Sequence, residues 1–369
     1  MSDSQRLLLS GNEAVAHAAV DAGVSLGAGY PGTPSTEILE HFSALGGPAE
    51  WAPNEKVALE VCLGASYGRA RSLATMKHVG LNVAADPLFT AAYTGVEGAL
   101  VIVTADDPGM ASSQNEQDNR HYARAAGVPM LEPGDSQEAY DFTLRAVEIS
   151  ERWNLPVLLR MTTRICHSRT VVHRRADAAT KPQTCDYRRD IKGRVMIPAY
   201  ARGAHRRLRG KLAEIAEFNE QSDLNPTVEG DRSLGIIADG VAYAHAREAA
   251  PTASFLKISM CHPLPMQTIR RFAESVDRCV VIEELDPYLV ESIRAAGVAV
   301  EGKAEMYRFG ELNVGRVRRI LAGETSPEPP PPKGKPPELC PGCPHRKSFE
   351  ILRDLGCIAT GGIAQDRHV

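Results

Sequence analysis

The stretch that decides the fold reads Asn54-Glu55-Lys56-Val57-Ala58 and continues to Gly64-Ala65-Ser66-Tyr67-Gly68-Arg69. Its small and apolar residues predict a helix that begins at Asn54 and Glu55, just after a short strand. Glu55 then lies in the first turn, where the helix dipole favours a carboxylate. The same position predicts buried surroundings, and a carboxyl in such surroundings holds its proton more tightly than one in water. A protonated carboxyl donates hydrogen bonds, so the glutamate has both a helix-terminal and a chemical interpretation.

Helices and strands are predicted to alternate around this segment, from Gly11 to about Arg164. Apolar runs predict strands at 24–30, 72–78, 99–105 and 156–161. Helix signals predict helices at 12–21, from Thr33 with Pro34 at its first position, and from the capping box 135–138 to 153. Such alternation is typical of a parallel sheet with helices on both faces. We therefore expect an α/β domain with a doubly wound parallel sheet over residues 1–167.

Four further sections follow this domain. Residues 168–233 break the alternation and are rich in arginine. We expect a connector with one helix at 211–219, whose basic side chains either form a solvated face or dock to an acidic partner. Alternation resumes over 234–322, where apolar runs predict strands at 234–237, 254–258 and 279–283. The proline-rich residues 323–338 predict an extended linker, and 339–369 predict the beginning of a further domain, too short for a core of its own.

Composition limits the functional class. The chain has 369 residues, of which 43% are hydrophobic and 24% are charged, as in ordinary globular proteins. Its formal net charge of -4 gives no sign of nucleic-acid or membrane-surface binding. The first residues lack the pattern of a signal peptide, no apolar run has the length of a membrane span, and the eight cysteines do not suggest a disulfide framework. We expect a cytoplasmic protein.

The run Gly27-Ala28-Gly29-Tyr30-Pro31-Gly32 matches the dinucleotide fingerprint G-x-G-x-x-G, but we reject that interpretation. Pro31 disfavours helical geometry at Tyr30 and has no N–H for a phosphate. We instead predict a substrate-binding loop, in which Gly32 lets a ligand approach the backbone. Thr33 would place a hydroxyl at a helix N-terminus, where a carboxylate is favoured, and would also serve as a simple cap.

Two of the predicted strands are followed by polar segments, which lie at 78–82, 106–110 and 112–120. Ligands of open α/β sheets bind at the carboxyl ends of the strands, and these segments belong to that edge. A long polar loop there is expected to contact a ligand or a partner chain. We take Asn82, Gln117 and Asp118 as candidate cofactor-binding residues.

The run Cys340-Pro341-Gly342-Cys343-Pro344-His345-Arg346 is a second chemical signal. Two thiols at this spacing suit half of a zinc ribbon, a redox dithiol or two ligands of an iron–sulfur cluster. Only Cys357 and His368 remain downstream as further candidate ligands, so no second pair closes a zinc ribbon. Cys340 and Cys343 are the candidate metal ligands.

Four motifs in this order resemble the alpha subunits of indolepyruvate:ferredoxin oxidoreductases, which belong to the thiamine-dependent 2-oxoacid:ferredoxin oxidoreductases. The motifs are Gly29-Tyr30-Pro31-Gly32-Thr33-Pro34-Ser35-Thr36-Glu37, Asn54-Glu55-Lys56-Val57-Ala58, Ser113-Gln114-Asn115-Glu116-Gln117-Asp118-Asn119-Arg120 and the Cys340–Arg346 run. Each motif is weak by itself, but the ordered set is specific and covers nearly the whole chain.

The resemblance implies a role for each section. Residues 1–167 resemble a thiamine-diphosphate-binding domain of the pyrimidine type, in which Glu55 matches the glutamate that hydrogen-bonds the aminopyrimidine ring. Thr33 matches the threonine near the substrate carboxylate. Residues 234–322 resemble the transketolase C-terminal domain. Cys340 and Cys343 match the first cysteines of the pyrophosphate-binding domain and imply ligands of a [4Fe-4S] cluster.

The resemblance also implies an activity and partners. The enzyme would oxidatively decarboxylate indolepyruvate and other aryl 2-oxoacids, with thiamine diphosphate and Mg²⁺ as cofactors. Coenzyme A would collect the acyl group, ferredoxin would accept the electrons, and a smaller beta subunit would complete the complex.

Two departures from the family pattern modify these expectations. An arginine that holds the substrate in pyruvate-using relatives is absent near Asp106-Asp107, and the sequence after Thr360-Gly361 lacks the family's third cysteine and its magnesium–diphosphate residues. Loss of those electrostatic contacts would weaken cofactor binding. The expectation is therefore a C-terminally truncated chain that binds the cofactor weakly and does not turn over alone. The alternative is a non-catalytic interaction subunit of a 2-oxoacid oxidoreductase complex.

Overall fold

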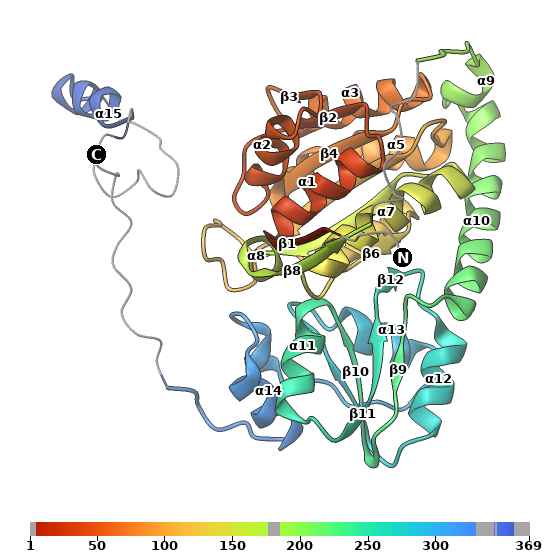
Figure 1. Cartoon of the computed structure of the whole chain (residues 1–369), viewed down its shortest axis with the longest axis vertical. Coiled ribbons are helices and arrows are strands. Elements are labelled where there is room, and N and C mark those ends of the chain that lie inside the picture. Colours follow the sequence, from red (N-terminus) through yellow and green to blue (C-terminus); the bar gives the residue numbers. More distant parts are fainter. Residues whose placement is uncertain (1–4, 176–184, 330–342, 344, 358–369) are drawn as a thin grey trace.

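Two α/β units follow one another along the chain (Figure 1). The computed structural model describes residues 5–175, 185–329, 343 and 345–357. The first unit is built on a seven-stranded sheet with the order β12-β6-β7-β5-β4-β2-β3. Its strands are β2 (Leu26–Gly29), β3 (Ala49–Trp51), β4 (Ser72–Lys77), β5 (Leu100–Asp106), β6 (Met130–Leu131), β7 (Val157–Thr162) and β12 (Met260–His262). All neighbours are parallel except β12, which runs antiparallel to β6.

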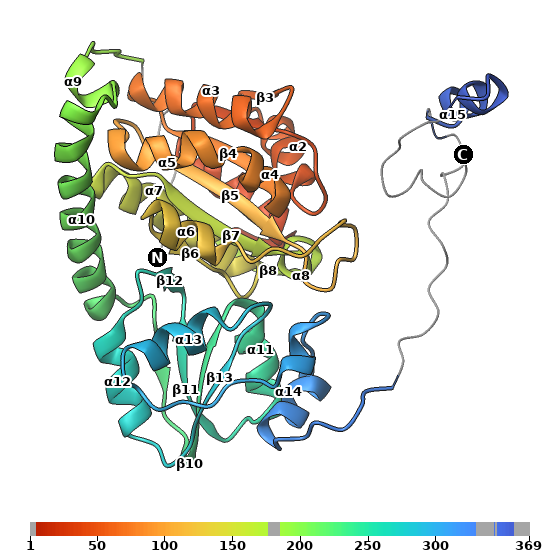
Figure 2. The same ribbon diagram turned by 180° about the vertical axis from the view of Figure 1, so that it is seen from behind.

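Helices cover both faces of this sheet, which confirms the doubly wound prediction. One face carries α1 (Gly11–Asp21), α2 (Thr36–Ala44) and α7 (Ser136–Trp153), as Figure 1 shows. The opposite face carries α3 (Glu55–Tyr67), α4 (His78–Val83), α5 (Ala85–Thr94) and α6 (Arg120–Ala126), as Figure 2 shows. Buried alanines on α1 (Ala14, Ala18 and Ala19, each 0% exposed) let it lie close against α2 and α7.

The order of the strands fixes where a site can form. The chain runs from β2 to β3 on one side, then returns to β4 on the other side of β2. Connections that leave β2 and β4 therefore diverge, and ligands of such sheets bind at the carboxyl ends of the strands next to this reversal. The loop after β2, the start of α3 and the start of α4 all lie at that edge.

The second unit contains a four-stranded sheet with the order β13-β10-β11-β9. Its strands are β9 (Thr227–Val228), β10 (Asp231–Asp239), β11 (Ala253–Ile258) and β13 (Cys279–Ile282), and its helices are α11 (Gly240–Ala249), α12 (Met266–Glu274), α13 (Tyr288–Ala295), η1 (Glu305–Arg308) and α14 (Val314–Leu321). The three predicted strands of this unit are confirmed. Because β12 leaves this unit to join the first sheet, the two units are tied by main-chain hydrogen bonds.

Two predictions about local structure were wrong, and one pair of strands was missed. Helix α2 begins at Thr36 rather than Thr33, because residues 32–35 close a turn in which the Ser35 N–H donates to the Gly32 carbonyl (2.9 Å). The connector holds α9 (Ile191–Arg194) and a long α10 (Pro198–Gln221), not a short helix at 211–219. Strands β1 (Gln5–Ser10) and β8 (Arg169–Arg174) pair as an antiparallel ribbon that the sequence did not predict, since its strands are far apart in the chain.

Two further helices lie outside the two sheets. Helix α8 (Thr163–His167) follows β7, and α15 (His345–Asp354) follows the proline-rich segment. Within the described ranges, no helix combines the length and apolar character needed to cross a bilayer.

Candidate active site

Glu55 is the first residue of α3 and stands at the predicted edge of the sheet. Asn54 caps the helix, with its side-chain oxygen accepting from the Val57 N–H at 3.0 Å, and this cap sets the position of Glu55. The Glu55 side chain is half-buried, not fully buried as the sequence suggested. Among the described residues, its carboxyl has no hydrogen-bond partner, so it can still take one from a ligand.

Gly80 of α4 makes the space in which the Glu55 carboxyl lies. A Cβ at Gly80 would sit 2.6 Å from Cγ of Glu55 and 2.7 Å from its Oε1, much closer than real contacts allow. Only glycine at position 80 therefore permits this position of the carboxyl. The pair brings together two segments that follow different strands, β3 and β4, at one point of the sheet edge.

The substitution Gly80→Ala is expected to displace the Glu55 carboxyl without unfolding the protein. Alanine is the better helix former by about 1 kcal/mol, and the clash involves the end of a flexible side chain. We expect unchanged or raised thermal stability, with any activity that depends on this carboxyl reduced about 10- to 100-fold by its misplacement.

Gly64→Ala in α3 is the matched control, because a Cβ at Gly64 meets nothing within 4 Å. This variant should gain similar stability and keep full turnover. Equal turnover in both variants would show that the Glu55 position does not depend on Gly80.

The loop after β2 brings Gly32 against β4. A Cβ at Gly32 would lie 3.1 Å from Cβ of Lys77, the last residue of β4. Thr33 is exposed within the closed turn, so the helix-terminal anion site predicted for Thr33 was wrong: the helix begins three residues later. The Gly32 N–H donates to Thr36 Oγ1 at 2.9 Å, and that donor is therefore taken up inside the loop.

The polar loop after β5 is held by side chains from several elements. Asp107 accepts from the Ser112 N–H (2.9 Å), Ser113 Oγ (2.5 Å) and Thr163 Oγ1 (2.7 Å). Burial alone would raise the pKa of Asp107, but these hydrogen bonds outweigh burial and lower it. His78 is fully buried, with Nε2 3.1 Å from the Asn115 carbonyl and, among the described residues, no partner at Nδ1.

The three cofactor-binding residues predicted in these loops have different surroundings. Asn82 is exposed and its Oδ1 accepts from Tyr122 Oη at 2.8 Å. Gln117 is half-buried, donates to Asn115 Oδ1 at 3.3 Å, and leaves its own Oε1 buried without a partner. Asp118 is buried and both of its carboxylate oxygens accept from Arg120, so a direct role in cofactor binding is not supported for Asp118.

Asp118 belongs to a buried ionic network between the two units. Arg120 is fully buried and reaches Asp239 Oδ2 (2.8 Å) and Glu283 Oε2 (2.7 Å) of the second unit. Arg160, also fully buried, bonds Asp106 Oδ2 at 2.7 Å, and its Nη1 lies 2.6 Å from Glu132 Oε1. One signal of this network is visible in the sequence and was missed. Arg160 is a charged residue within the otherwise apolar strand β7, and a buried charge needs partners of opposite charge.

Burial changes the protonation of this network. It raises the pKa of Glu132 to about 8 despite Arg160, that of Glu283 to about 7 despite Arg120, and that of Glu284 to about 7 despite Lys303. The pKa of Asp118 is lowered instead, because the attraction of Arg120 and Arg160 exceeds the effect of burial. The network holds more carboxyl groups than cationic side chains, and some of these carboxyl groups therefore carry protons near neutral pH.

Stability is expected to fall as the pH rises from about 6.5 to 8. The folded state holds protons on Glu132, Glu283 and Glu284 that the unfolded chain has already released above pH 4.5, and these protons are lost as the pH passes 7 and 8. The expected slope is roughly 1 kcal/mol per pH unit for each group while the pH is below its folded pKa, and the contribution fades above that pKa. Three histidines have the opposite effect below pH 6.5, because burial lowers their pKa values and protonation then favours the unfolded chain. They are His17, His245 and His262.

Urea unfolding at pH 6.5, 7.2 and 8.0 measures this dependence. Glu132→Gln removes one of the titrating groups and should make the slope shallower, whereas Glu148→Gln on the exposed face of α7 should leave the slope unchanged. Equal slopes in the wild type and Glu132→Gln would contradict the assignment.

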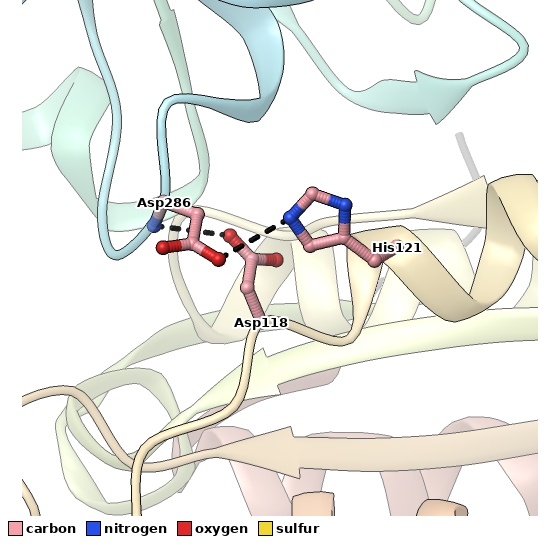
Figure 3. A group of neighbouring side chains, drawn as sticks. All are labelled: Asp118, His121 and Asp286. Atoms are coloured by element: carbon pink, nitrogen blue, oxygen red, sulfur yellow. Dashed lines mark hydrogen bonds and ion pairs between the residues drawn. The ribbon is translucent and has the colours of Figure 1, made fainter.

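A metal site is poorly supported in the described part of the chain. One group of acidic and histidine side chains, Asp118, His121 and Asp286, has ligand atoms within 4.8 Å of one another (Figure 3). Asp118 is already engaged by Arg120, and His121 Nε2 lies 3.3 Å from Asp286 Oδ2. We interpret this group as an ion-paired cluster. Cys340 lies outside the described residues, and Cys343 is half-buried.

Comparisons with known proteins identify the family of the chain. The profile of the pyruvate flavodoxin/ferredoxin oxidoreductase, thiamine diphosphate-binding family matches residues 17–211, more than half of the chain. The chain belongs to this family. The match includes the loop after β2, Glu55, Gly80 and the polar loop after β5.

Full-length relatives point to one branch of the family. The indolepyruvate oxidoreductase subunit IorA of Archaeoglobus fulgidus is 40% identical over 405 residues, covering 98% of this chain and 65% of the relative. The subunit IorA of Methanothermobacter thermautotrophicus is 41% identical over 377 residues, covering 95% of this chain and 61% of the relative. The resemblance to the indolepyruvate-type alpha subunits is thus confirmed, and the chain spans less than two thirds of the length of these relatives.

Solved structures confirm the fold. The 2-oxoglutarate:ferredoxin oxidoreductase from Magnetococcus marinus has a TM-score of 0.74 at 16% identity, covering 88% of this chain and 66% of that one. A split-gene transketolase has a TM-score of 0.56 at 16% identity, covering 85% of this chain and 97% of that one. The expected thiamine-diphosphate-type α/β architecture is therefore correct.

Proposed function

We propose that the first unit binds the aminopyrimidine end of thiamine diphosphate through Glu55. The observation that carries this proposal is the Glu55 carboxyl itself, which projects at the carboxyl edge of the sheet, rests on Gly80 and has no partner among the described residues. A carboxyl placed there can form a hydrogen bond with a ring nitrogen of the cofactor. When bound, thiamine diphosphate supplies the electron sink for decarboxylation of 2-oxoacids.

The residues around Glu55 offer polar groups to a ring system. Gly80 leaves room for the Glu55 carboxyl, Gly32 brings the loop after β2 close to the end of β4, and Nδ1 of buried His78 has no partner among the described residues. Thr33, exposed in the loop after β2, is available to a substrate bound beside the ring. Mg²⁺ and the diphosphate would be held outside this set of residues.

The full activity that we propose is oxidative decarboxylation of an aryl 2-oxoacid, with indolepyruvate as the substrate suggested by the names of the relatives. Electrons would pass through iron–sulfur clusters to ferredoxin, with Cys340 and Cys343 as cluster ligands. Coenzyme A would receive the acyl group, and a smaller beta subunit would complete a cytoplasmic enzyme.

The test is reconstitution of the complete subunit with its beta subunit. Indolepyruvate should drive ferredoxin reduction only when thiamine diphosphate, Mg²⁺ and coenzyme A are all present. Formation of a stable complex that shows no cofactor-dependent reduction with any aryl 2-oxoacid would favour the non-catalytic alternative.

A further inference from the structure

Lys77 is a buried cation at the carboxyl end of β4, where the connections that leave β2 and β4 diverge. It is the last residue of β4 and only 8% exposed. Its Cβ lies directly below Gly32, where an added methyl group would be 3.1 Å away. The lysine therefore shares the carboxyl edge of the sheet with the loop after β2 and with the start of α4.

The ammonium group of Lys77 has little compensation from the protein. Nζ donates to the Ser112 carbonyl at 2.7 Å, which uses one of its three donors. No carboxylate oxygen in the described ranges lies within ion-pair distance of it. Asp107 attracts the ammonium group from beyond that distance, but the oxygens of Asp107 accept hydrogen bonds from Ser112, Ser113 and Thr163.

Such an arrangement is unfavourable for the protein alone. Burial lowers the pKa of Lys77, and the attraction of Asp107 offsets this only in part. A desolvated cation with unused donors is stabilised when an anion enters next to it. His78, the following residue, adds a second unsatisfied group, because its side chain is fully buried and Nδ1 has no partner.

We propose that Lys77 binds the carboxylate of the 2-oxoacid substrate. The inference rests on the proposed function. Lys77 would supply the substrate with a cation from the end of β4. The loop after β5 contains no arginine before Arg120, and Arg120 already pairs with acids of the buried network. A lysine is a compact point charge and needs no fixed bidentate geometry, so Nζ can keep its bond to Ser112 while it contacts a carboxylate.

Matched ligands separate this role from a structural one. The probes are 3-phenyllactate, an inert carboxylate analogue of an aryl 2-oxoacid, and its neutral counterpart 3-phenyllactamide. Binding is measured by calorimetry on the reconstituted holoenzyme. We expect the wild type to prefer the carboxylate by about 10- to 100-fold, as for a hydrogen bond between charged groups.

The decisive variant is Lys77→Gln, because glutamine removes the charge but can still donate to the Ser112 carbonyl. It should lose the preference for the carboxylate and bind the amide as the wild type does, and the KM for the 2-oxoacid should rise by a similar factor. Lys77→Arg should retain the preference. Lys56→Gln, which changes an exposed lysine next to Glu55, should behave as the wild type.

The outcomes are distinguishable. If Lys77→Gln weakens both ligands equally, Lys77 only supports the loop and the proposal is wrong. If the variant does not fold, loss of the preference in Lys77→Arg would overturn the proposal, and its retention would support it. If the wild type binds neither ligand and reduces no ferredoxin with aryl 2-oxoacids, the proposed function fails and this inference fails with it.

Discussion

The substitution Glu55→Gln is expected to lower turnover of the reconstituted oxidoreductase by about 10²- to 10⁴-fold, the range of a well-placed proton-transfer group. The amide has nearly the same shape, so the contact with Gly80 and the cap of α3 by Asn54 should remain. What would change, under the proposed role of Glu55, is the ability to exchange a proton with the ring nitrogen. Thermal unfolding should therefore stay close to that of the wild type.

A second measurement separates chemistry from binding in this variant. Exchange of the acidic carbon-bound proton of thiamine diphosphate for deuterium, followed by NMR after rapid quenching, should slow by a similar factor. Glu60→Gln is the control, because Glu60 is an exposed residue on the same helix. Unchanged exchange and turnover in Glu55→Gln would remove this residue from the mechanism.

The substitution Arg120→Met is expected to cost about 3–5 kcal/mol of unfolding free energy. Methionine fills much of the space but leaves Asp118, Asp239 and Glu283 buried without their cation. It also removes the donors to the main-chain carbonyls of Glu284 and Asp286, at 2.8 and 3.0 Å. The thermal transition should fall by at least about 5 °C.

Arg145→Met provides the comparison for Arg120. Arg145 pairs with Glu148 and Asp223 on the surface, where ion pairs contribute about 0–1 kcal/mol. If both variants unfold like the wild type, the buried network does not hold the two units together.

Because Arg120 ends the polar loop after β5, its loss should also reduce substrate binding through displacement of that loop.

The sequence predicted the elements whose signals are local. Continuous apolar runs identified β4, β5 and β7, and the Asp135–Glu138 cap identified the start of α7. The helix at Glu55 was identified from its small and apolar residues. The start of α2 was missed because a turn closed by Ser35 and Gly32 decides it, and the helix signal at Thr33 and Pro34 does not outweigh that turn.

The sequence by itself determined the family and the doubly wound class, and it proposed Glu55 as the candidate acid, since these depend on residue types and their order along the chain. Tertiary structure decided which distant residues meet. Gly80 receives the Glu55 carboxyl, Lys77 lies under Gly32, and Arg120 joins the acids of both units. The physical reason is that the order of strands in the sheet sets these contacts. The order of residues along the chain does not reveal that β2 lies between β3 and β4.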